Sequence, residues 1–577
     1  MTFSFKLLLL FKKAPLFLGL LFLVGCPSKS YKKTKSPKKY GATGKRSMIS
    51  TQGPLSTKAG QLIFKKGGNA VDAAIAVSFA ISVERPQSTG IGGGGFLLLK
   101  TPDSETPLSF DFREMAPHKS HQKMFLGPSG KEQKGKSING PLSAGVPGLV
   151  AGLFHIHKKF GTLPMETLIE PAAKMAEEGF PVYPHLARAI KARASVLKQY
   201  PSSKKIFFKK GEPLKVGDRL IQEDLAKTLR LIAHFGKKGF YGGFVGNQIA
   251  KENQKEGGII SLEDLANYKV KERKPIKGSY KGYDVYSMGP PSSGGVHILQ
   301  ILNIIEKDPL KKMGYGSADS IHLISSAMQM AFVDRAFHLG DSDFVKVPTQ
   351  KLISKNYAKM LRKRIKLNIA QTFEESRIRT PFPKESDETT HFTIMDKSGW
   401  TVSSTQTING WMGSGFVVPG TGVILNNEMD DFAQKVGASN LFEAFGGEKN
   451  LIEPKKRPLS SMSPTIILKD GKVKLALGTP SGTRILTCVA QTIINYLTFE
   501  MDLYEAVAAT RFHHQWSPNE IRVGSNPFPT SIISELEKKG HKVKFKPLGC
   551  KIQAIADEGA VLRGVSDPRG EGLSLGE

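Results

Sequence analysis

The most informative part of the chain is the stretch Asp387-Glu388-Thr389-Thr390-His391-Phe392. It follows a polar segment with two prolines, residues 369–388, and it leads into a strand-like run. If the chain cuts itself between Glu388 and Thr389, the new N-terminal threonine supplies both a hydroxyl nucleophile and a free α-amine that takes its proton. Two threonines at the start of a strand are also explained by β-propensity alone. The residues that follow must decide between these interpretations.

The sequence after Thr389 is typical of a β-hairpin. Residues 396–399, Asp-Lys-Ser-Gly, form a turn signal, and residues 400–407 read as a second strand. With Asp396 opposite Gly399, the register places Thr389 opposite Gln406. Because Thr407 is the next residue, the hairpin predicts a threonine hydroxyl close to Thr389.

Other segments predict an α+β protein with strands near the C-terminus and helices before and after them. An Ala-rich run behind Asn69 predicts a buried, capped helix, and Phe110-Asp111-Phe112-Arg113 predicts a strand. The patterns in the rest of the chain predict a mainly helical region (148–368), a second hairpin (464–477) and two helices (482–498 and 502–510).

Charge is the unusual feature of the composition. The 577 residues include 82 Lys and Arg against 51 Asp and Glu, a formal net charge of +31. A basic excess can indicate nucleic acid or an anionic membrane surface. The sequence has no helix-turn-helix, zinc-finger spacing or aromatic-interleaved basic strand, so we expect no nucleic-acid partner. No cluster has metal-ligand spacing, and we expect neither a metal nor a cofactor.

The N-terminus is typical of an export signal. Basic residues precede an apolar run, residues 14–24, that is too short to span a membrane. The run ends in Leu23-Val24-Gly25-Cys26, which resembles a bacterial lipobox with Cys26 as the lipidated residue; an ordinary signal peptide with an incidental cysteine is the alternative. We therefore predict a signal peptide (1–25), a basic flexible tether (26–46) and an exported, periplasmic protein anchored to the membrane by lipid.

The remaining two cysteines do not establish a disulfide. Cys488 lies in an apolar run and is predicted to be a small buried hydrophobic residue, and Cys550 is far away in sequence. Two cysteines are too few to predict a disulfide framework.

Six motifs in the same order resemble the γ-glutamyltranspeptidase family. They begin near residue 47 and extend almost to the end of the chain. They comprise Gly92-Gly93-Gly94-Gly95-Phe96, residues 111–117, residues 290–295, Thr389-Thr390-His391-Phe392, residues 425–432 and residues 457–464. The resemblance implies the four-layer αββα sandwich of N-terminal nucleophile hydrolases. It also implies a large subunit (47–388) and a small subunit (389–577), cut from one precursor at Glu388-Thr389 and held as a heterodimer.

The implied activity is γ-glutamyl transfer and glutathione hydrolysis. Thr389 would form a γ-glutamyl ester, resolved by water or by an amino acid or peptide acceptor, and Thr407 would position it. By resemblance, Arg113, Ser460 and Ser461 bind the donor's α-carboxylate, and Asn409, Glu428 and Asp431 bind its α-ammonium. A planar guanidinium suits a carboxylate through its bidentate fork.

The segment 479–483 resembles the family's oxyanion loop, in which Ser481 and Gly482 would act through backbone N–H groups. The family usually has glycine at the place of Ser481. A lid, roughly residues 434–447, carries Phe442 where bacterial relatives often have tyrosine, and Met412 stands where an aromatic residue is common. These departures put the rate and the acceptor preference in question.

Alternative functions remain open at this stage. A β-lactam side-chain acylase of the glutaryl or cephalosporin type shares the chemistry but needs no ammonium pocket, and a non-catalytic lipoprotein could retain the fold. A dinucleotide-binding fingerprint at residues 90–95 is disfavoured because a strand, not a helix, is expected after it. A serine elbow at residues 572–576 is disfavoured because no helix can follow it.

Overall fold

The computed structural model describes residues 41–577 except residue 134, residues 374–388 and residues 525–526. The predicted signal peptide, the lipidation of Cys26 and the cleavage residue Glu388 therefore lie outside the described residues. No helix in the described part is long and apolar enough to cross a membrane.

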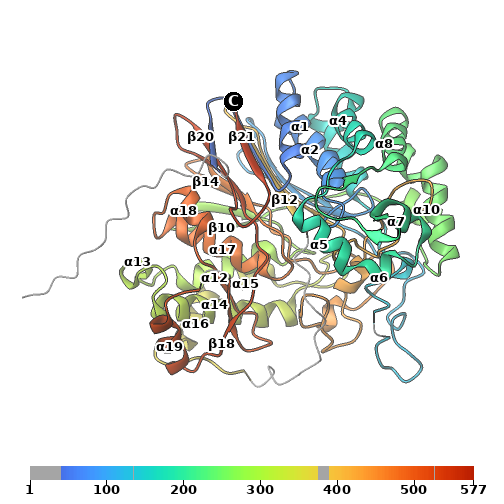
Figure 1. Ribbon diagram of the computed structural model, residues 1–577. Coiled ribbons are helices and arrows are strands. Elements are labelled where there is room, and N and C mark those ends of the chain that lie inside the picture. The colour runs from blue at the N-terminus through green and yellow to red at the C-terminus, as the bar shows by residue number, and fades with distance from the viewer. Residues whose placement is uncertain (1–40, 134, 374–388, 525–526) are drawn as a thin grey trace, which may run out of the picture. The chain divides into compact units, whose positions relative to one another are not determined.

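Two seven-stranded antiparallel sheets dominate the described chain (Figure 1). The first sheet has the order β1 (Gly41–Gly44), β20 (Leu562–Ser566), β19 (Gln553–Asp557), β15 (Lys472–Gly478), β14 (Thr465–Lys469), β11 (Tyr283–Ser287) and β10 (Ile276–Tyr280). The second has the order β21 (Leu573–Gly576), β2 (Ser47–Thr51), β12 (Thr390–Asp396), β13 (Thr401–Thr407), β3 (Gly94–Lys100), β4 (Leu108–Phe112) and β9 (Lys271–Arg273).

Apolar side chains from both sheets meet in a shared core. Met48, Leu98 and Met395 of the second sheet pack with Ile466 and Ile555 of the first. The central strands of the two sheets, β12 and β13 against β15 and β19, are in direct contact. The alternation of strand residues thus buries one face of each sheet against the other.

Helices cover the outer faces of the sheets. In Figure 1 the blue-to-green helices and the yellow-green-to-red helices lie on opposite sides of the strands. The first group comprises α1 (Pro54–Lys65), α2 (Ala70–Glu84), α3 (Leu149–Phe160), α4 (Met165–Glu178), α5 (Pro184–Ala192), α6 (Ala194–Leu197), α7 (Pro201–Phe207), α8 (Glu223–Phe235), α9 (Lys238–Tyr241), α10 (Gly243–Lys255) and α11 (Leu262–Ala266). The second comprises α12 (Gly294–Ile305), α13 (Leu310–Met313), α14 (Ala318–His338), α15 (Thr349–Leu352), α16 (Lys355–Arg364), α17 (Arg484–Leu497), α18 (Leu503–Ala508) and α19 (Thr530–Lys538).

Short strands complete the described structure. They are β16 (Phe512–His513), β17 (Ile521–Val523) and β18 (Val543–Phe545) in one sheet, and the pairs β5 (Phe180–Pro181) with β8 (Arg219–Leu220) and β6 (Phe208–Lys209) with β7 (Glu212–Pro213).

The hairpin that follows Thr389 has a register one residue away from the predicted one. Thr390 pairs with Gln406, which places Thr389 level with Thr407. The prediction was wrong because the turn is longer by one residue: the Asp396 N–H donates to the Trp400 carbonyl, 3.0 Å away. The Asp396 carboxylate accepts the Trp400 N–H at 3.2 Å and closes that wider turn.

Several local predictions are confirmed. Asn69 caps α2, because its side chain accepts the N–H groups of Val71 and Asp72. The glycine run leads into the strand β3, and residues 573–576 form the strand β21. These strands contradict the helix that a dinucleotide fingerprint or a serine elbow requires.

Two expectations need correction. The strand β1 begins at Gly41 and pairs with β20, so sheet structure starts within the segment predicted to be a flexible tether. Cys488 is buried, as predicted, but it forms a disulfide with Cys550 across a sequence separation of 62 residues. Sequence alone could not bring α17 next to the loop that contains Cys550.

Candidate active site

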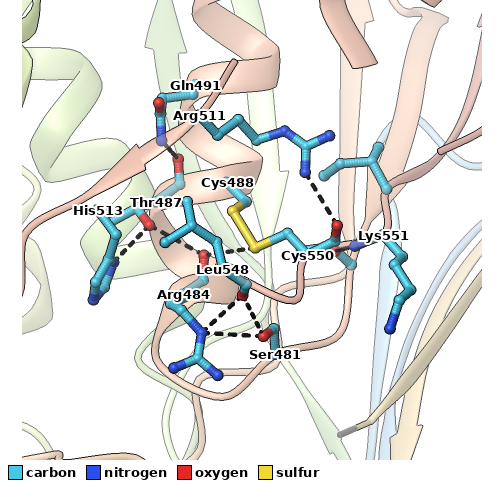
Figure 2. The surroundings of a disulfide bond; sticks show 12 residues. Ser481, Arg484, Thr487, Cys488, Gln491, Arg511, His513, Leu548, Cys550 and Lys551 are labelled. Carbon is cyan, nitrogen blue, oxygen red and sulfur yellow. Dashed lines mark hydrogen bonds between the residues drawn. A yellow bond between two sulfur atoms is a disulfide. The ribbon is translucent and has the colours of Figure 1, made fainter. Parts of the chain in front are cut away.

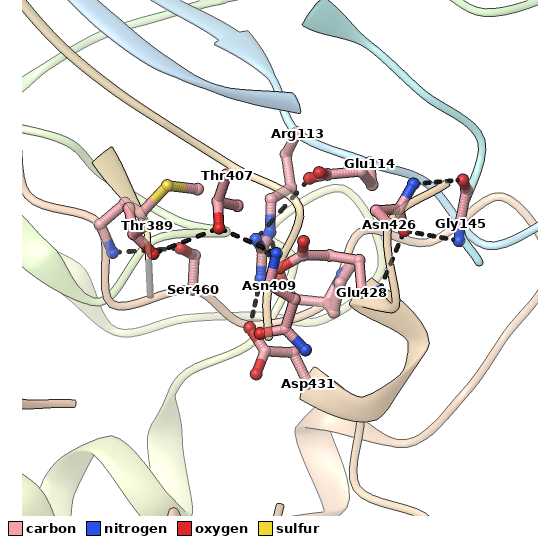
Figure 3. A network of polar contacts seen from close by, with 12 residues as sticks. Arg113, Glu114, Gly145, Thr389, Thr407, Asn409, Asn426, Glu428, Asp431 and Ser460 are labelled. Atoms are coloured by element: carbon pink, nitrogen blue, oxygen red, sulfur yellow. Dashed lines mark hydrogen bonds and ion pairs between the residues drawn. The ribbon is translucent and has the colours of Figure 1, made fainter. Parts of the chain in front are cut away.

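Thr389 lies at the start of β12, with its hydroxyl facing the neighbouring strand. Its Oγ1 is 3.2 Å from the Oγ1 of Thr407, the last residue of β13 (Figure 3). The Thr407 hydroxyl in turn accepts the Asn409 N–H at 2.9 Å. Thr389 has a φ of 131°, which strains a β-branched residue. The hairpin thus holds the predicted nucleophile in a strained backbone conformation, with its hydroxyl hydrogen-bonded to Thr407.

Arg113 follows directly after β4 and is almost fully buried. One of its terminal nitrogens donates to Glu428 through a very short contact, and the other donates to Asp431 at 2.6 Å. Its Nε donates to the Pro458 carbonyl at 3.3 Å. The two carboxylates come from the short 3-10 helix η3 (Glu428–Asp431). The site therefore holds the predicted carboxylate-binding and ammonium-binding groups as one ion cluster.

Burial and charge act on this cluster in opposite directions. Burial opposes the charged form of Arg113, but Glu428, Asp431 and Glu114 outweigh it and raise the arginine pKa. Burial also raises the pKa of Glu428 and Glu114, although Arg113 lowers both. Three carboxyl groups thus surround the Arg113 guanidinium, and an additional cation near Glu428 would be stabilised.

The remaining predicted donor-binding residues line the same cavity. Asn409 adopts a φ of 72° and donates from its side chain to the Asn427 carbonyl at 3.0 Å. The Ser460 hydroxyl accepts the Met462 N–H at 3.1 Å. Ser461 accepts a hydrogen bond from Arg335 at 3.2 Å. The cavity is lined by these residues together with Thr389, Thr407, Arg113, Glu428, Asp431 and Gly482.

The loop 479–483 lines this cavity with Gly482 and Thr483, and Gly482 has a φ of 53°. The Ser481 side chain is directed away, because its hydroxyl donates to the Leu548 carbonyl at 2.6 Å (Figure 2). Ser481 has a φ of 109°, and this hydrogen bond and the Arg484 Nε bond at 3.1 Å hold that strained backbone. The backbone N–H groups of Ser481 and Gly482 donate to no described residue.

The lid residue Phe442 closes one side of the cavity. A Cβ added at Gly482 would lie 2.2 Å from the Phe442 ring, so the ring sits directly on the oxyanion loop. Asn440 connects the lid to the ion cluster by donating to Asp431 at 2.8 Å. Met412, the other departure, is fully buried and lies outside the cavity.

The sequence reasoning missed Arg335. This residue of α14 is buried, lines the cavity, and donates from Nε to the Ser293 hydroxyl at 3.1 Å as well as to Ser461. Burial lowers its pKa to about 10, although Asp431 raises it. The signal that could have found it is an Asp-Arg pair within the otherwise apolar residues 330–336.

The chain is similar over nearly its whole length to proteins of known identity. The profile of the family described as gamma-glutamyltranspeptidase matches residues 56–576. The glutathione hydrolase proenzyme of Escherichia coli (strain K12) is 46% identical over 527 residues, covering 91% of this chain and 90% of that relative.

Solved structures show the same similarity. The cephalosporin acylase from Bacillus halodurans superposes with a TM-score of 0.81 at 28% identity, covering 96% of this chain and 99% of that one. The Helicobacter pylori gamma-glutamyltranspeptidase superposes with a TM-score of 0.54 at 46% identity, covering 55% of this chain and 91% of that one. Sequence identity is higher to the transpeptidase, whereas the structural match is longer with the acylase.

Proposed function

The chain belongs to the gamma-glutamyltranspeptidase family, and from that premise we propose that it is a proenzyme that hydrolyses glutathione and transfers γ-glutamyl groups. The observation that carries the proposal is the placement of Thr389 beside the ion cluster of Arg113, Glu428 and Asp431 in one cavity. A γ-glutamyl donor has an α-carboxylate and an α-ammonium at one end and the amide to be cleaved at the other. Its charged end matches the cluster and its amide matches the threonine.

Self-cleavage would start the chemistry. In the precursor, the Thr389 hydroxyl attacks the Glu388 carbonyl carbon, and the C–N bond between the two residues breaks to give an ester and a free Thr389 α-amine. Water then hydrolyses the ester, which separates the two chains and restores the Thr389 hydroxyl. That amine then takes the hydroxyl proton during attack on the donor's γ-carbonyl. The proton passes to the leaving amine, and a γ-glutamyl ester of Thr389 remains. Water resolves it to glutamate, and an amino acid or peptide amine resolves it by transfer.

Two groups would support that attack. The Thr407 hydroxyl positions the Thr389 oxygen through the 3.2 Å contact. The N–H groups of Ser481 and Gly482 would receive the negative charge of the tetrahedral intermediate. Each such donor contributes roughly 2.7–4 kcal/mol to lowering the barrier.

Donor binding would proceed by exchange of partners within the cluster. The donor carboxylate replaces the Glu428 and Asp431 oxygens at Arg113, and the donor ammonium then pairs with those two carboxylates. The number of positive and negative groups stays balanced, because the donor end is a zwitterion. Ser460, Ser461 and Asn409 line the space that the donor end would occupy.

The balance of positive and negative groups in the donor site also distinguishes this function from that of a glutaryl or cephalosporin acylase. A glutaryl group adds a carboxylate without an ammonium, so it would leave buried carboxylates unpaired, at a cost of about 3–5 kcal/mol. The test compares hydrolysis of γ-glutamyl-anilide and glutaryl-anilide by the purified protein. We expect a preference of at least about a hundredfold in kcat/KM for the γ-glutamyl compound. An equal or reversed preference would assign the chain to the acylases.

The wider organisation follows from the same proposal. The flanked pair of sheets would be the four-layer αββα sandwich of N-terminal nucleophile hydrolases, with residues 47–388 as the large subunit and residues 389–577 as the small subunit of a heterodimer. The lipobox-like Cys26 supports an exported, periplasmic protein anchored to the membrane by lipid. Mass spectrometry of the N-terminal peptide tests that location, because an unmodified Cys26 rules the anchor out.

A further inference from the structure

A second cavity is lined by residues 547–551, where the Leu548 carbonyl accepts a hydrogen bond from the Ser481 hydroxyl of the loop 479–483. It has a volume of about 310 Å³ and is formed by the end of α2, by α5, by the loop 547–551 and by residues 569–571. A volume of about 300 Å³ is at the lower end of the range for small-molecule sites. Five cationic side chains and one carboxylate, Glu571, line it; the cations are Arg85, Arg188, Arg511, Lys551 and Arg569.

Nearby carboxylates neutralise only part of this charge. Asp567, behind the cavity wall, pairs with both Arg511 and Arg569. Glu571 lies 3.8 Å from Arg85 and accepts the backbone N–H of His185. Arg188 is exposed and has no ion pair with a described residue. The cavity therefore keeps an excess of positive charge.

A buried donor at the wall lacks a partner. Arg511 is 4% exposed and lines the cavity, and its Nε makes no hydrogen bond to a described residue. Burial lowers the pKa of Arg511 to about 10, although Asp567 raises it. Burial and the charges of Lys551, Arg85 and Arg188 hold the pKa of His185 well below its usual range. The effect of the three cations on His185 indicates a positive field in the cavity, which an anion would relieve.

We propose that this cavity binds a small multivalent oxyanion, a polyphosphate or a polycarboxylate, and that the bound anion acts on the oxyanion loop. Several guanidinium forks around one space are suited to the planar or tetrahedral oxygens of such groups. The site is separate from the donor cavity, with which it shares no lining residue.

The connection to the oxyanion loop runs through residues 548–551 (Figure 2). The Leu548 carbonyl accepts from the Ser481 hydroxyl and from Arg484 Nε, at 2.6 and 2.8 Å. The Lys551 N–H donates to the Thr479 hydroxyl at 2.8 Å. Cys550, which lines the cavity, is bonded to Cys488 of α17, the helix that begins after the loop. An anion that draws Lys551 inward would therefore pull on the segment holding Ser481.

The test is titration of the mature protein with pyrophosphate and with citrate by calorimetry, at matched ionic strength because salt screens such contacts. We expect saturable binding of one anion per protein. Arg188→Glu with Lys551→Glu should weaken it at least about tenfold. The control, Lys359→Glu with Lys363→Glu, makes the same charge change on exposed residues of α16 and should bind like the original protein. All proteins should melt alike without anion.

The outcomes separate the parts of the proposal. No saturable binding, or equal binding by the charge-reversed protein, overturns the site. Binding that leaves kcat unchanged overturns the coupling to the oxyanion loop. An anion effect confined to KM that persists in the charge-reversed protein places the anion in the donor cavity instead and also overturns the coupling. Calorimetry does not need turnover, so a failure of the proposed enzymatic function leaves the binding test intact.

Discussion

At Arg113 the guanidinium already has two carboxylate partners before a donor arrives. Arg113→Lys keeps the charge but cannot hold a carboxylate with a planar fork. Losing charge-assisted hydrogen bonds of about 1.5–3 kcal/mol predicts a KM about 10- to 100-fold higher for a γ-glutamyl-anilide, with kcat changed far less. Self-cleavage should persist, because no donor takes part in it. Steady-state kinetics measure the change, and an unaltered KM would remove Arg113 from donor recognition.

Asp430 gives the site a pH-dependent stability. It is buried between the Ser137 hydroxyl and the Leu441 N–H of the lid, and burial raises its pKa to about 7. The folded protein therefore binds this proton more tightly than the unfolded chain, so the stability that the group contributes declines as pH rises from about 4 through about 7. Asp430→Asn stays neutral throughout and should lose that part of the decline.

Melting temperatures of both proteins near pH 5 and near pH 8 measure the effect. Burial also raises the pKa of Glu114 and Glu428, so these groups lower the stability of both proteins as pH rises. The informative quantity is therefore the difference between the two proteins in how far the melting temperature falls. We expect the original protein to lose a few degrees more than Asp430→Asn on going to the higher pH. Parallel curves would show that Asp430 is ionised without penalty.

At the scale of elements, the lid and the oxyanion loop meet at Phe442 and Gly482. A methyl group at Gly482 would lie 2.2 Å from the Phe442 ring. Gly482→Ala should therefore displace either the lid or the loop, and we expect kcat to fall by at least about tenfold, since overpacking costs about 1–3 kcal/mol. Adding Phe442→Ala should recover a substantial part. Full activity of Gly482→Ala alone would show that the contact does not shape the site.

The disulfide joins two elements that are distant in the chain. Closing a loop of 62 residues between Cys488 and Cys550 should stabilise the fold by about 2–4 kcal/mol. Cys488→Ser with Cys550→Ser should therefore lower the midpoint of denaturant unfolding. The original protein measured with strong reductant is the matched control and should approach the variant. Midpoints that coincide in all three samples would show that the bond adds no stability.

At the scale of the whole molecule, the sequence predicted local secondary structure better than it predicted contacts between segments that are far apart in the chain. The strands after Thr389, the capped helix behind Asn69 and the second hairpin follow from local alternation and turn chemistry. The hairpin register was missed by one residue because the Asp396 side chain closes a wider turn. Arg335 and the pairing of Cys550 were missed because each depends on a contact between segments far apart in the chain.

Prediction of the donor site from the sequence was limited in the same way. Motif resemblance named Arg113, Glu428 and Asp431, and they share one cavity with Thr389. It assigned them to opposite charges of the donor, and in the structure they pair with one another. The proposal that donor binding exchanges these partners rests on the three-dimensional arrangement alone.

The central claim is that one peptide bond breaks by itself and turns Thr389 into both nucleophile and base. Intact-mass and N-terminal analysis of the purified protein tests it most directly, with Thr389→Ala as the control. We predict two chains whose second one begins at Thr389, and for Thr389→Ala one uncut, inactive chain. Fully active protein with the Glu388–Thr389 bond intact, or with its break elsewhere, would contradict the account.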